Sequence, residues 1–325
     1  MLKSASCITR HPLNPVLSAK DVPFDADLVF NAGVIKLDGT YYMLFRNDYC
    51  SPRGSQNLAG TNIGLARSAD GIKWEVDPET RFDDFSGGEI KRIYDPRLQV
   101  IDGEIYICLA VATWHGIRGG IAKTDRDFRS FEMLSMSAPD NRNMVLFPEK
   151  INGKFARLER PFPVYSRGYD IFDAWYSDSP DLKYWGNTQL VLPREKVPFA
   201  NAKVGPAAPP IKTKKGWLTT FHAVSAVPPK KNGWEDSWGK EYYAGLMLLD
   251  LEDPAKVIGI AEEPLLVPET DYETKDGFRN DVIFPGGMIL EDDGEVKIYY
   301  GAADTVECLA TANVDDLIAL CLKNK

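Results

Sequence analysis

An acidic residue held between an aromatic residue and a proline is the first candidate for chemistry in this sequence. Asp95 lies in the stretch Tyr94-Asp95-Pro96-Arg97, just ahead of an apolar, strand-like run. Because proline restricts the residue before it, we expect an extended Asp95 at the rigid entrance of a strand. A carboxyl group aimed in this way could protonate a leaving group, whereas in a simple turn it would only accept backbone N–H groups.

Basic side chains further along the chain form a second candidate group, which consists of Arg142, Arg160, Lys203 and His222. Arginine offers forked donors that match the geometry of phosphate oxygens, and lysine adds a point charge. Taken singly, the arginines could pair with carboxylates or lie in exposed loops, the lysine could be solvated, and the histidine could be an interior residue. Their recurrence at equivalent places in a repeat favours a shared anion pocket.

The elements that would position these residues form an internal repeat. Five times, two strand-like runs flank a turn-forming dipeptide, and a further apolar run follows. The dipeptides are Asp38-Gly39, Asp102-Gly103, Asn152-Gly153, Lys215-Gly216 and Asp293-Gly294. Five such units predict an all-β fold, a five-bladed β-propeller that occupies residues 1–325 as one domain, with an irregular β-sandwich as the alternative. Only residues 314–322 favour a short helix.

In a propeller, the residues just before the first strand and just after the second strand of each blade meet at one end of the central channel. Counting from each turn places these residues there: Asn31, Arg46, Asp48, Asp95, Trp114, His115, Arg142, Asn143, Arg160, Lys203, His222, Asn280, Asp281 and Asp304. Carboxylates with nearby aromatic residues suit a sugar site. An acid facing several cations favours phosphorolysis, because phosphate needs no general base. A water-dependent glycosidase and a non-catalytic sugar-binding propeller are the alternatives.

Composition narrows the class of partner. The chain has 325 residues, with 38 basic and 47 acidic side chains and a net charge of −9, which disfavours nucleic acid and anionic membranes. Five cysteines without CxxC spacing and three scattered histidines predict neither a disulfide framework nor a metal site. We find no apolar leader and no apolar run long enough to span a bilayer, so we expect a cytoplasmic protein with reduced thiols.

Six short motifs, taken together and in order, resemble glycoside hydrolase family 130, the β-mannoside phosphorylases and related mannosidases. These motifs are Tyr94-Asp95-Pro96-Arg97, Asn141-Arg142-Asn143, Glu159-Arg160-Pro161, Lys203-Val204-Gly205, Phe221-His222 and Gly301-Ala302-Ala303-Asp304. The resemblance implies a five-bladed propeller that performs inverting phosphorolysis, with inorganic phosphate as co-substrate and no other cofactor. The implied partners are mannose-containing oligosaccharides, with β-1,4 linkages favoured over β-1,2 linkages, and a β-mannosidase that uses water remains the hydrolytic alternative.

The same resemblance implies a role for each site residue. Asp95 would be the catalytic acid, passing its proton to the glycosidic oxygen through a mannose hydroxyl. The residues expected to bind phosphate are Arg142, Asn143, Arg160, Lys203, His222 and Tyr242. The residues expected to contact the sugar are Asn31, Arg46 and Asp304, with the rim carboxylate Asp48 placed beside them. Loops 49–60 and 224–241, the latter with Trp234 and Trp238, are expected to select the acceptor, and the family allows a homo-oligomer.

Overall fold

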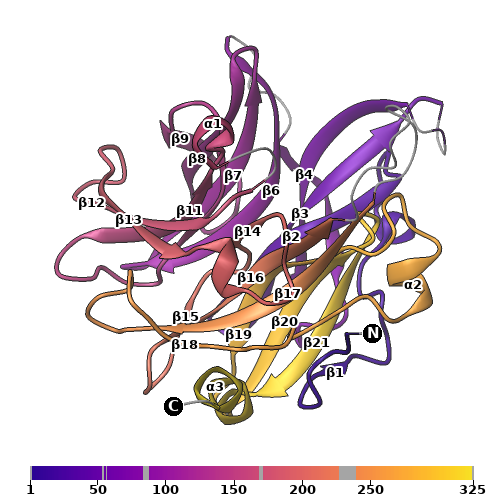
Figure 1. Cartoon of the computed structure of the whole chain (residues 1–325). Helices are drawn as coiled ribbons and strands as arrows, with labels where there is room; N and C mark the ends of the chain where they lie inside the picture. Colours follow the sequence, from indigo (N-terminus) through magenta and orange to yellow (C-terminus); the bar gives the residue numbers. More distant parts are fainter. Residues whose placement is uncertain are drawn as a thin grey trace.

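Five small antiparallel sheets make up the computed structural model, which describes residues 2–52, 55, 57–82, 88–167, 171–226 and 239–323 (Figure 1). The sheets are the blades of a five-bladed β-propeller, so the predicted fold is confirmed. The predicted hairpins are present too. In Asp38-Gly39, Asp102-Gly103 and Asn152-Gly153, both turn residues take positive φ, the conformation that a two-residue type I′ turn requires.

The first three blades follow the chain in order, each starting with its innermost strand. Blade 1 consists of β2 (Leu28–Leu37), β3 (Thr40–Cys50), β4 (Leu58–Ser68) and β5 (Glu75–Phe82). Blade 2 consists of β6 (Ile90–Ile101), β7 (Glu104–Thr113), β8 (Gly116–Thr124) and β9 (Phe131–Met136). Blade 3 consists of β10 (Asn141–Leu146), β11 (Phe155–Pro161), β12 (Ala174–Ser179) and β13 (Gly186–Leu192).

The last two blades depart from this simple order. In blade 4, β14 (Val204–Pro206) and β15 (Ile211–Lys212) share the innermost position against β16 (Trp217–Ala226), and β17 (Lys240–Leu249) and β18 (Val257–Ile260) follow. Blade 5 consists of β19 (Ile283–Leu290), β20 (Glu295–Ala302), β21 (Val306–Asn313) and the N-terminal β1 (Thr9–Arg10). The helical elements are η1 (Ala19–Asp21), α1 (Val164–Arg167), η2 (Arg194–Lys196), α2 (Asp271–Thr274) and α3 (Val314–Leu322), the last as predicted. None of the described helices could cross a membrane.

The N-terminal segment completes the last blade and so closes the ring. β1 pairs with β21, which places the first strand of the chain at the outer edge of a sheet built from its last strands (Figure 1). Arg10 of β1 donates hydrogen bonds from Nε and Nη2 to Glu273 at 2.8 and 3.0 Å. Glu273 is fully buried and also accepts a hydrogen bond from the Tyr300 hydroxyl at 2.9 Å. Besides its backbone pairing with β21, β1 is therefore held by the ion pair between Arg10 and the buried, hydrogen-bonded carboxylate of Glu273.

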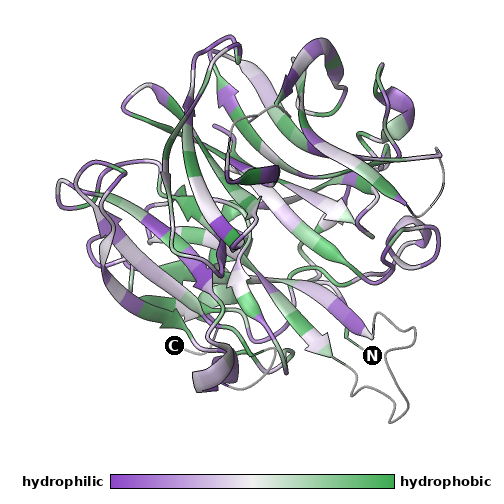
Figure 2. Ribbon diagram, turned by 90° about the horizontal axis from the view of Figure 1, so that it is seen from above, coloured by the Kyte–Doolittle hydropathy of each residue, from purple (hydrophilic) through white to green (hydrophobic). Residues whose placement is uncertain are grey.

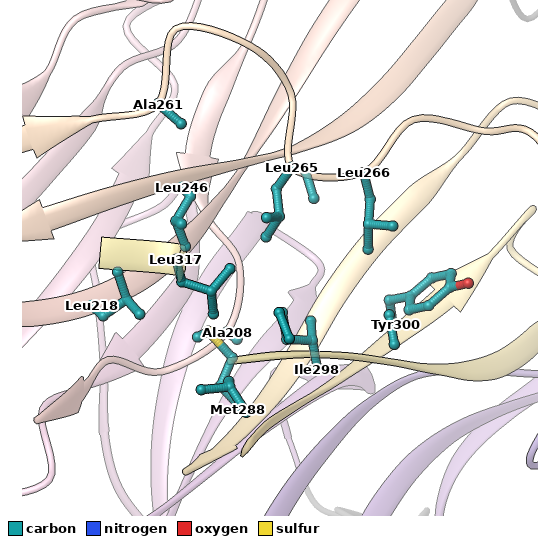
Figure 3. Packing of buried hydrophobic residues seen from close by; sticks show 14 of the residues in the cluster. Ala208, Leu218, Leu246, Ala261, Leu265, Leu266, Met288, Ile298, Tyr300 and Leu317 are labelled. Carbon is teal, nitrogen blue, oxygen red and sulfur yellow. The ribbon is translucent and has the colours of Figure 1, made fainter. Parts of the chain in front are cut away.

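Apolar side chains fill the spaces between neighbouring sheets. Between blades 4 and 5, Leu218, Leu246, Met288 and Ile298 pack together with Leu317 of α3 (Figure 3). Hydrophobic segments run through the strands of the sheets, while hydrophilic residues are common in the connecting loops (Figure 2). Because the innermost strands contribute side chains to such cores, they are held in fixed positions around the axis.

The innermost strands of four blades are interrupted at matching positions. Their pairing shifts register between Phe30 and Gly33 in β2, between Tyr94 and Arg97 in β6, between Arg142 and Val145 in β10, and between Pro285 and Gly287 in β19. A β-bulge of this kind leaves backbone groups unpaired within the ladder and re-aims the side chains beside it.

Arg97, which is only 4% exposed, binds backbone carbonyl groups at three of these interruptions and a fourth carbonyl between β14 and β15 of blade 4. Its guanidinium donates hydrogen bonds to the carbonyl oxygens of Ala207 (2.7 Å, from Nε), Asn31 and Pro96 (3.1 and 2.7 Å, from Nη1) and Pro285 (3.4 Å, from Nη2). These carbonyls belong to four different blades. The buried cation therefore ties the inner segments of most of the ring together.

Gly286 shows how closely the inner strands approach one another. A Cβ atom at this position would overlap the carbonyl oxygen of Ala32 in the neighbouring blade and lie 3.3 Å from Nη1 of Arg97. We therefore expect Gly286→Ala to lower the free energy of unfolding by about 1–3 kcal/mol, as overpacking of a core does. Gly186→Ala is the matched control, because a Cβ there meets nothing within 4 Å, and its effect should stay within about 0.5 kcal/mol. Urea unfolding measures both, and equal stabilities would contradict the expectation.

Candidate active site

The bulged ends of the inner strands surround a pocket. Its lining consists of Asn31, Arg46, Tyr94, Asp95, Arg142, Asn143, Arg160, Tyr242, Arg279, Val282, Phe284 and Asp304. Most of the predicted site residues are among them, although they are far apart in the sequence. Counting positions from the repeated turns thus found a group of side chains that do meet in space. The roles assigned to them toward sugar and phosphate remain predictions.

Three of these residues lie at the bulges and take left-handed backbone conformations. The φ angles of Asn31, Asp95 and Asn143 are 53°, 53° and 56°. The prediction of an extended Asp95 before Pro96 was therefore wrong. The bulge in β6 outweighs the restraint from proline, and aspartate and asparagine are the residues that tolerate this conformation best after glycine. The extra residue at each bulge lets these side chains line the pocket.

Asp95 lies among positive charges. Its Oδ1 accepts hydrogen bonds from Nδ2 of Asn31 at 3.0 Å and from Nη1 of Arg46 at 3.3 Å. Burial opposes a charge on Asp95, but Arg46, Arg97, the Asn31 amide and Arg142 outweigh it and lower the pKa of this carboxyl group. In the ligand-free pocket Asp95 is therefore a carboxylate at neutral pH.

Asp48 lies behind the pocket instead of lining it. Its two carboxylate oxygens accept hydrogen bonds from Nε and Nη2 of Arg46 at 2.9 and 2.6 Å, and Thr61 adds a hydroxyl donor at 2.7 Å. The side chain is 4% exposed. A direct contact between Asp48 and a sugar stays a prediction, and the observed geometry gives Asp48 the task of fixing the orientation of Arg46.

Asp304 is the second carboxyl group in the pocket lining. Burial raises its pKa, against the opposing effect of Arg279 and Arg46, so the two carboxyl groups of the pocket are shifted in opposite directions. Arg279 donates a hydrogen bond from Nη1 to Asp304 at 3.1 Å. Sequence counting missed Arg279 by one position, because it chose residues 280–281. Asn280 instead accepts a hydrogen bond from the backbone of Gly277.

Arg142 and Arg160 form a cationic wall. They are directly opposite each other in the β10–β11 ladder, and the ring of Phe162 lies 5.4 and 5.1 Å from their guanidinium carbons. Like charges in this position destabilise a sheet, so the arrangement is suited to an anion. Nε of Arg142 and Oδ1 of Asn143 are buried without a hydrogen-bond partner in the part of the chain that the structure describes. Tyr242 borders the pocket, and burial raises the pKa of its hydroxyl.

Lys203 and His222 do not line the pocket but lie beside this wall. Nζ of Lys203 is 5.0 Å from the ring centre of Phe172, which lies equally far from the guanidinium carbon of Arg160. The fully buried His222 contacts the Pro206 carbonyl through Nδ1 at 3.1 Å and Nη1 of Arg160 through Nε2 at 2.9 Å. Because a carbonyl only accepts and a guanidinium only donates, the imidazole is neutral with its hydrogen on Nδ1. Direct phosphate contacts by either residue remain predictions.

Other residues that the sequence analysis placed at this end of the central channel do not line the pocket. Trp114 is 67% exposed, and Nζ of Lys91 lies 3.7 Å from its ring centre. His115 follows it in the turn between β7 and β8 and is exposed as well. Trp234 and Trp238, proposed as acceptor-stacking residues, lie outside the described residues.

The neutral state of the buried His222 can be tested by measuring how the stability of the protein depends on pH. Burial, Arg160, Arg142 and Lys203 lower its pKa well below 6.5, although the hydrogen bond to Pro206 opposes this. The unfolded chain therefore binds a proton near pH 6 that the folded chain does not, so stability falls as the pH drops. We expect His222→Gln to flatten the decline between pH 7 and pH 5 by up to about 1.4 kcal/mol per pH unit. Urea unfolding at several pH values measures it, and equal slopes would refute the assignment of a neutral histidine.

Comparison with known proteins covers nearly the whole chain. The family profile described as beta-1,4-mannooligosaccharide phosphorylase matches residues 9–323. A 1,2-beta-oligomannan phosphorylase of Thermoanaerobacter sp. (strain X514) is 32% identical over 93% of this chain and 96% of its own length. A beta-1,4-mannooligosaccharide phosphorylase of Ruminococcus albus is 32% identical over 97% of this chain and 92% of its own length.

A solved structure supports the same relationship. The beta-1,2-mannobiose phosphorylase from Listeria innocua, in complex with beta-1,2-mannobiose, aligns with a TM-score of 0.80 at 26% identity. The alignment covers 97% of this chain and 99% of the Listeria chain. The chain thus belongs to glycoside hydrolase family 130, and it is an enzyme of the glycoside phosphorylase class.

Proposed function

We propose that this enzyme catalyses the inverting phosphorolysis of β-mannosides, chiefly β-1,4-mannooligosaccharides, to α-mannose 1-phosphate and a shortened sugar. The observation that carries the proposal is the cationic wall of Arg142 and Arg160 in the same pocket as Asp95. Phosphate is already an anion and needs no general base, so this wall supplies what such a nucleophile requires. Inorganic phosphate and a mannose-containing oligosaccharide are then the two substrates, and the reaction needs no other cofactor.

The two sides of the pocket divide the reaction between them. Asp95 serves as the acid, and Asp304 and Arg46 contact the mannose ring that is transferred. Phosphate on the cationic wall attacks the anomeric carbon from the face opposite the leaving group, which inverts its configuration. The bond from the anomeric carbon to the glycosidic oxygen breaks, a bond to a phosphate oxygen forms, and the proton of Asp95 reaches the departing oxygen through a mannose hydroxyl.

The protonation state of Asp95 depends on whether the phosphate nucleophile is bound. Arg142 is one of the groups that lower the pKa of this carboxyl group in the ligand-free pocket. A phosphate bound beside Arg142 offsets part of that positive field and raises the pKa of Asp95, which favours the protonated acid that the reaction needs. A water molecule brings no charge and does not have this effect. The pocket therefore favours phosphate over water for electrostatic reasons as well as geometric ones.

The linkage has a second candidate, β-1,2. The family profile and the Ruminococcus relative support β-1,4-mannooligosaccharides, whereas the Thermoanaerobacter relative and the Listeria structure carry β-1,2 specificities. A panel of β-1,4- and β-1,2-linked mannobioses, followed by release of α-mannose 1-phosphate, separates the two. Preference for the β-1,2 substrate would reassign the linkage and leave the reaction type intact.

Phosphate dependence is the direct test of the reaction. Incubated with mannooligosaccharides, the enzyme should release α-mannose 1-phosphate when phosphate is present and show almost no turnover when it is omitted. Asp95→Asn keeps the shape of the side chain without its proton, so it should lower kcat by about 10²- to 10⁴-fold while sugar binding persists. Product analysis by ion chromatography and sugar titration by calorimetry measure these effects. Equal release of free mannose without phosphate would instead show a hydrolase.

The cationic wall can be tested separately from the acid. Loss of a charge-assisted hydrogen bond to phosphate is worth roughly 1.5–3 kcal/mol, so Arg160→Ala and Arg142→Ala should each raise the phosphate KM by about tenfold or more. Arg118→Ala is the matched control, because Arg118 pairs with Glu89 and does not line the pocket. Initial rates over a range of phosphate concentrations measure KM, and melting temperatures confirm folding. An unchanged KM in both wall variants would place the phosphate elsewhere.

A further inference from the structure

A buried carboxyl group that the proposed reaction does not use lies behind Asn31. Glu307 of β21 is 0% exposed, and its Oε2 accepts a hydrogen bond from the backbone N–H of Ala32 at 3.1 Å. Its Oε1 has no hydrogen-bond partner in the described ranges. Glu307 belongs to blade 5, while Ala32 belongs to the bulge in the innermost strand of blade 1. The side chain thus reaches from the last blade to the bulge of the first.

Gly301 leaves the space that the side chain of Asn31 occupies. It is paired with Glu307 across β20 and β21, and a Cβ atom at Gly301 would lie 2.8 Å from the backbone nitrogen of Asn31 and overlap its side-chain oxygen. The space above the glycine therefore holds the asparagine side chain, while the neighbouring glutamate holds the backbone of the bulge. Together they set the position of Nδ2 of Asn31, which donates to Asp95 at 3.0 Å.

We propose that Glu307 is a positioning residue for the acid of the reaction: it fixes the bulge at Asn31-Ala32 and, through it, the hydrogen bond from Asn31 to Asp95. This inference rests on the proposed function, because it concerns the acid of that reaction. The cationic wall comes from β10 and β11 of blade 3, whereas Glu307 belongs to blade 5 and binds the bulge of blade 1. Loss of Glu307 should therefore change kcat far more than the phosphate KM.

Because Glu307 can ionise, its positioning role should affect how the activity depends on pH. Burial raises its pKa to about 8, against the opposing effects of the Ala32 and Asn31 N–H groups and of Arg97. The charged or titratable groups that face it are Arg97 from β6 and Cys308 on its own strand, while β2 and β20 present backbone amides and Gly301.

At neutral pH, Glu307 therefore carries its proton, and it ionises as the pH rises through about 8. Oε1 of Glu307 and Oδ1 of Asn31 are both buried without a hydrogen-bond partner in the described part of the chain. In this proposal, the neutral acid donates its hydroxyl hydrogen to that amide oxygen. Ionisation removes that donor and leaves a negative charge buried behind the bulge. Activity should decline on the alkaline side for this reason.

Three substitutions separate positioning from folding. Glu307→Gln keeps an acceptor for the Ala32 N–H and cannot ionise, so it should retain most of the kcat at pH 7 and lose the decline above about pH 8. Glu307→Leu removes the acceptor at similar size and should lower kcat about 10- to 100-fold, the usual effect of misplacing a catalytic group, with the phosphate KM within about twofold. Glu273→Gln is the control: it alters another fully buried carboxyl group, so it should lower the melting temperature without changing kcat or the pH profile.

A double-mutant cycle tests whether Glu307 affects kcat through Asn31. If Glu307 acts through Asn31, Glu307→Leu combined with Asn31→Ala should lose no more kcat than Asn31→Ala alone. Multiplied losses would overturn the inference, as would a Glu307→Leu enzyme with the kcat and pH profile of the original. Should Glu307→Leu fail to fold, the profile of Glu307→Gln decides, and an unchanged alkaline decline rejects the proposal.

The proposed function can fail independently of this role. An enzyme that releases no α-mannose 1-phosphate from any mannoside would refute phosphorolysis without bearing on Glu307. A crystal structure of Glu307→Leu would then test positioning directly. Displacement of Asn31 Nδ2 from its hydrogen bond with Asp95 supports the inference, and an unmoved Asn31 overturns it.

Discussion

Both the ring of blades and the pocket depend on one interaction, the hydrogen bonding of the buried Arg97 guanidinium to backbone carbonyl groups. A cation that is 4% exposed must exchange its hydration for other hydrogen-bond acceptors, and here backbone carbonyls from four blades replace the water. The carbonyls of Asn31 and Pro96 are within reach because the bulges remove them from the regular ladder. The same bulges give Asn31 and Asp95 their left-handed backbones. The link between the blades through Arg97 and the orientation of Asp95 are therefore consequences of the same kind of local distortion, the bulges in β2 and β6.

Two of the arginines that line the pocket are each held by a buried polar residue outside the lining. Asp48 holds Arg46 through two hydrogen bonds, and His222 receives one from Arg160. Because these partners come from the strands of the blades themselves, the pocket side chains are held by rigid elements. Preorganised groups lose little free energy to rearrangement when charge develops during a reaction. This second layer explains why some residues with the right chemistry do not line the pocket.

The repeat in the sequence predicted the fold well because tight turns are local features. Asp-Gly and Asn-Gly dipeptides readily take the positive φ angles of tight turns between two strands, so they locate hairpins without knowledge of the rest of the chain. Bulges are not local in this sense, since they depend on which residues face each other across two strands. The backbone of Asp95 was therefore predicted wrongly, although its place at the pocket was found. The two-residue strand β1 has no pattern of its own, and only its pairing with β21 defines it.

Site residues were predictable where strand ends decide position and unpredictable where side-chain direction decides it. Arg142 and Arg160 lie at neighbouring strand ends, and both line the pocket. His222 occupies an equivalent position in blade 4, but its ring lies against Pro206 and leaves the pocket to the arginine in front of it. Arg97 was visible as part of a motif, yet nothing in the sequence shows that its carbonyl partners come from distant blades.

The order of the blades around the ring has a chemical consequence. Asn31, Asp95 and Asp304 come from blades 1, 2 and 5, which are consecutive once the ring is closed, whereas Arg142 and Arg160 come from blade 3. The acid and the cations are thus supplied by separate sectors of one pocket. In the proposed reaction, a sugar held between these sectors would have its leaving group near Asp95 and its anomeric carbon open to an anion from the other side. Displacement with inversion needs that separation, because the nucleophile and the leaving group must occupy opposite faces of the same carbon.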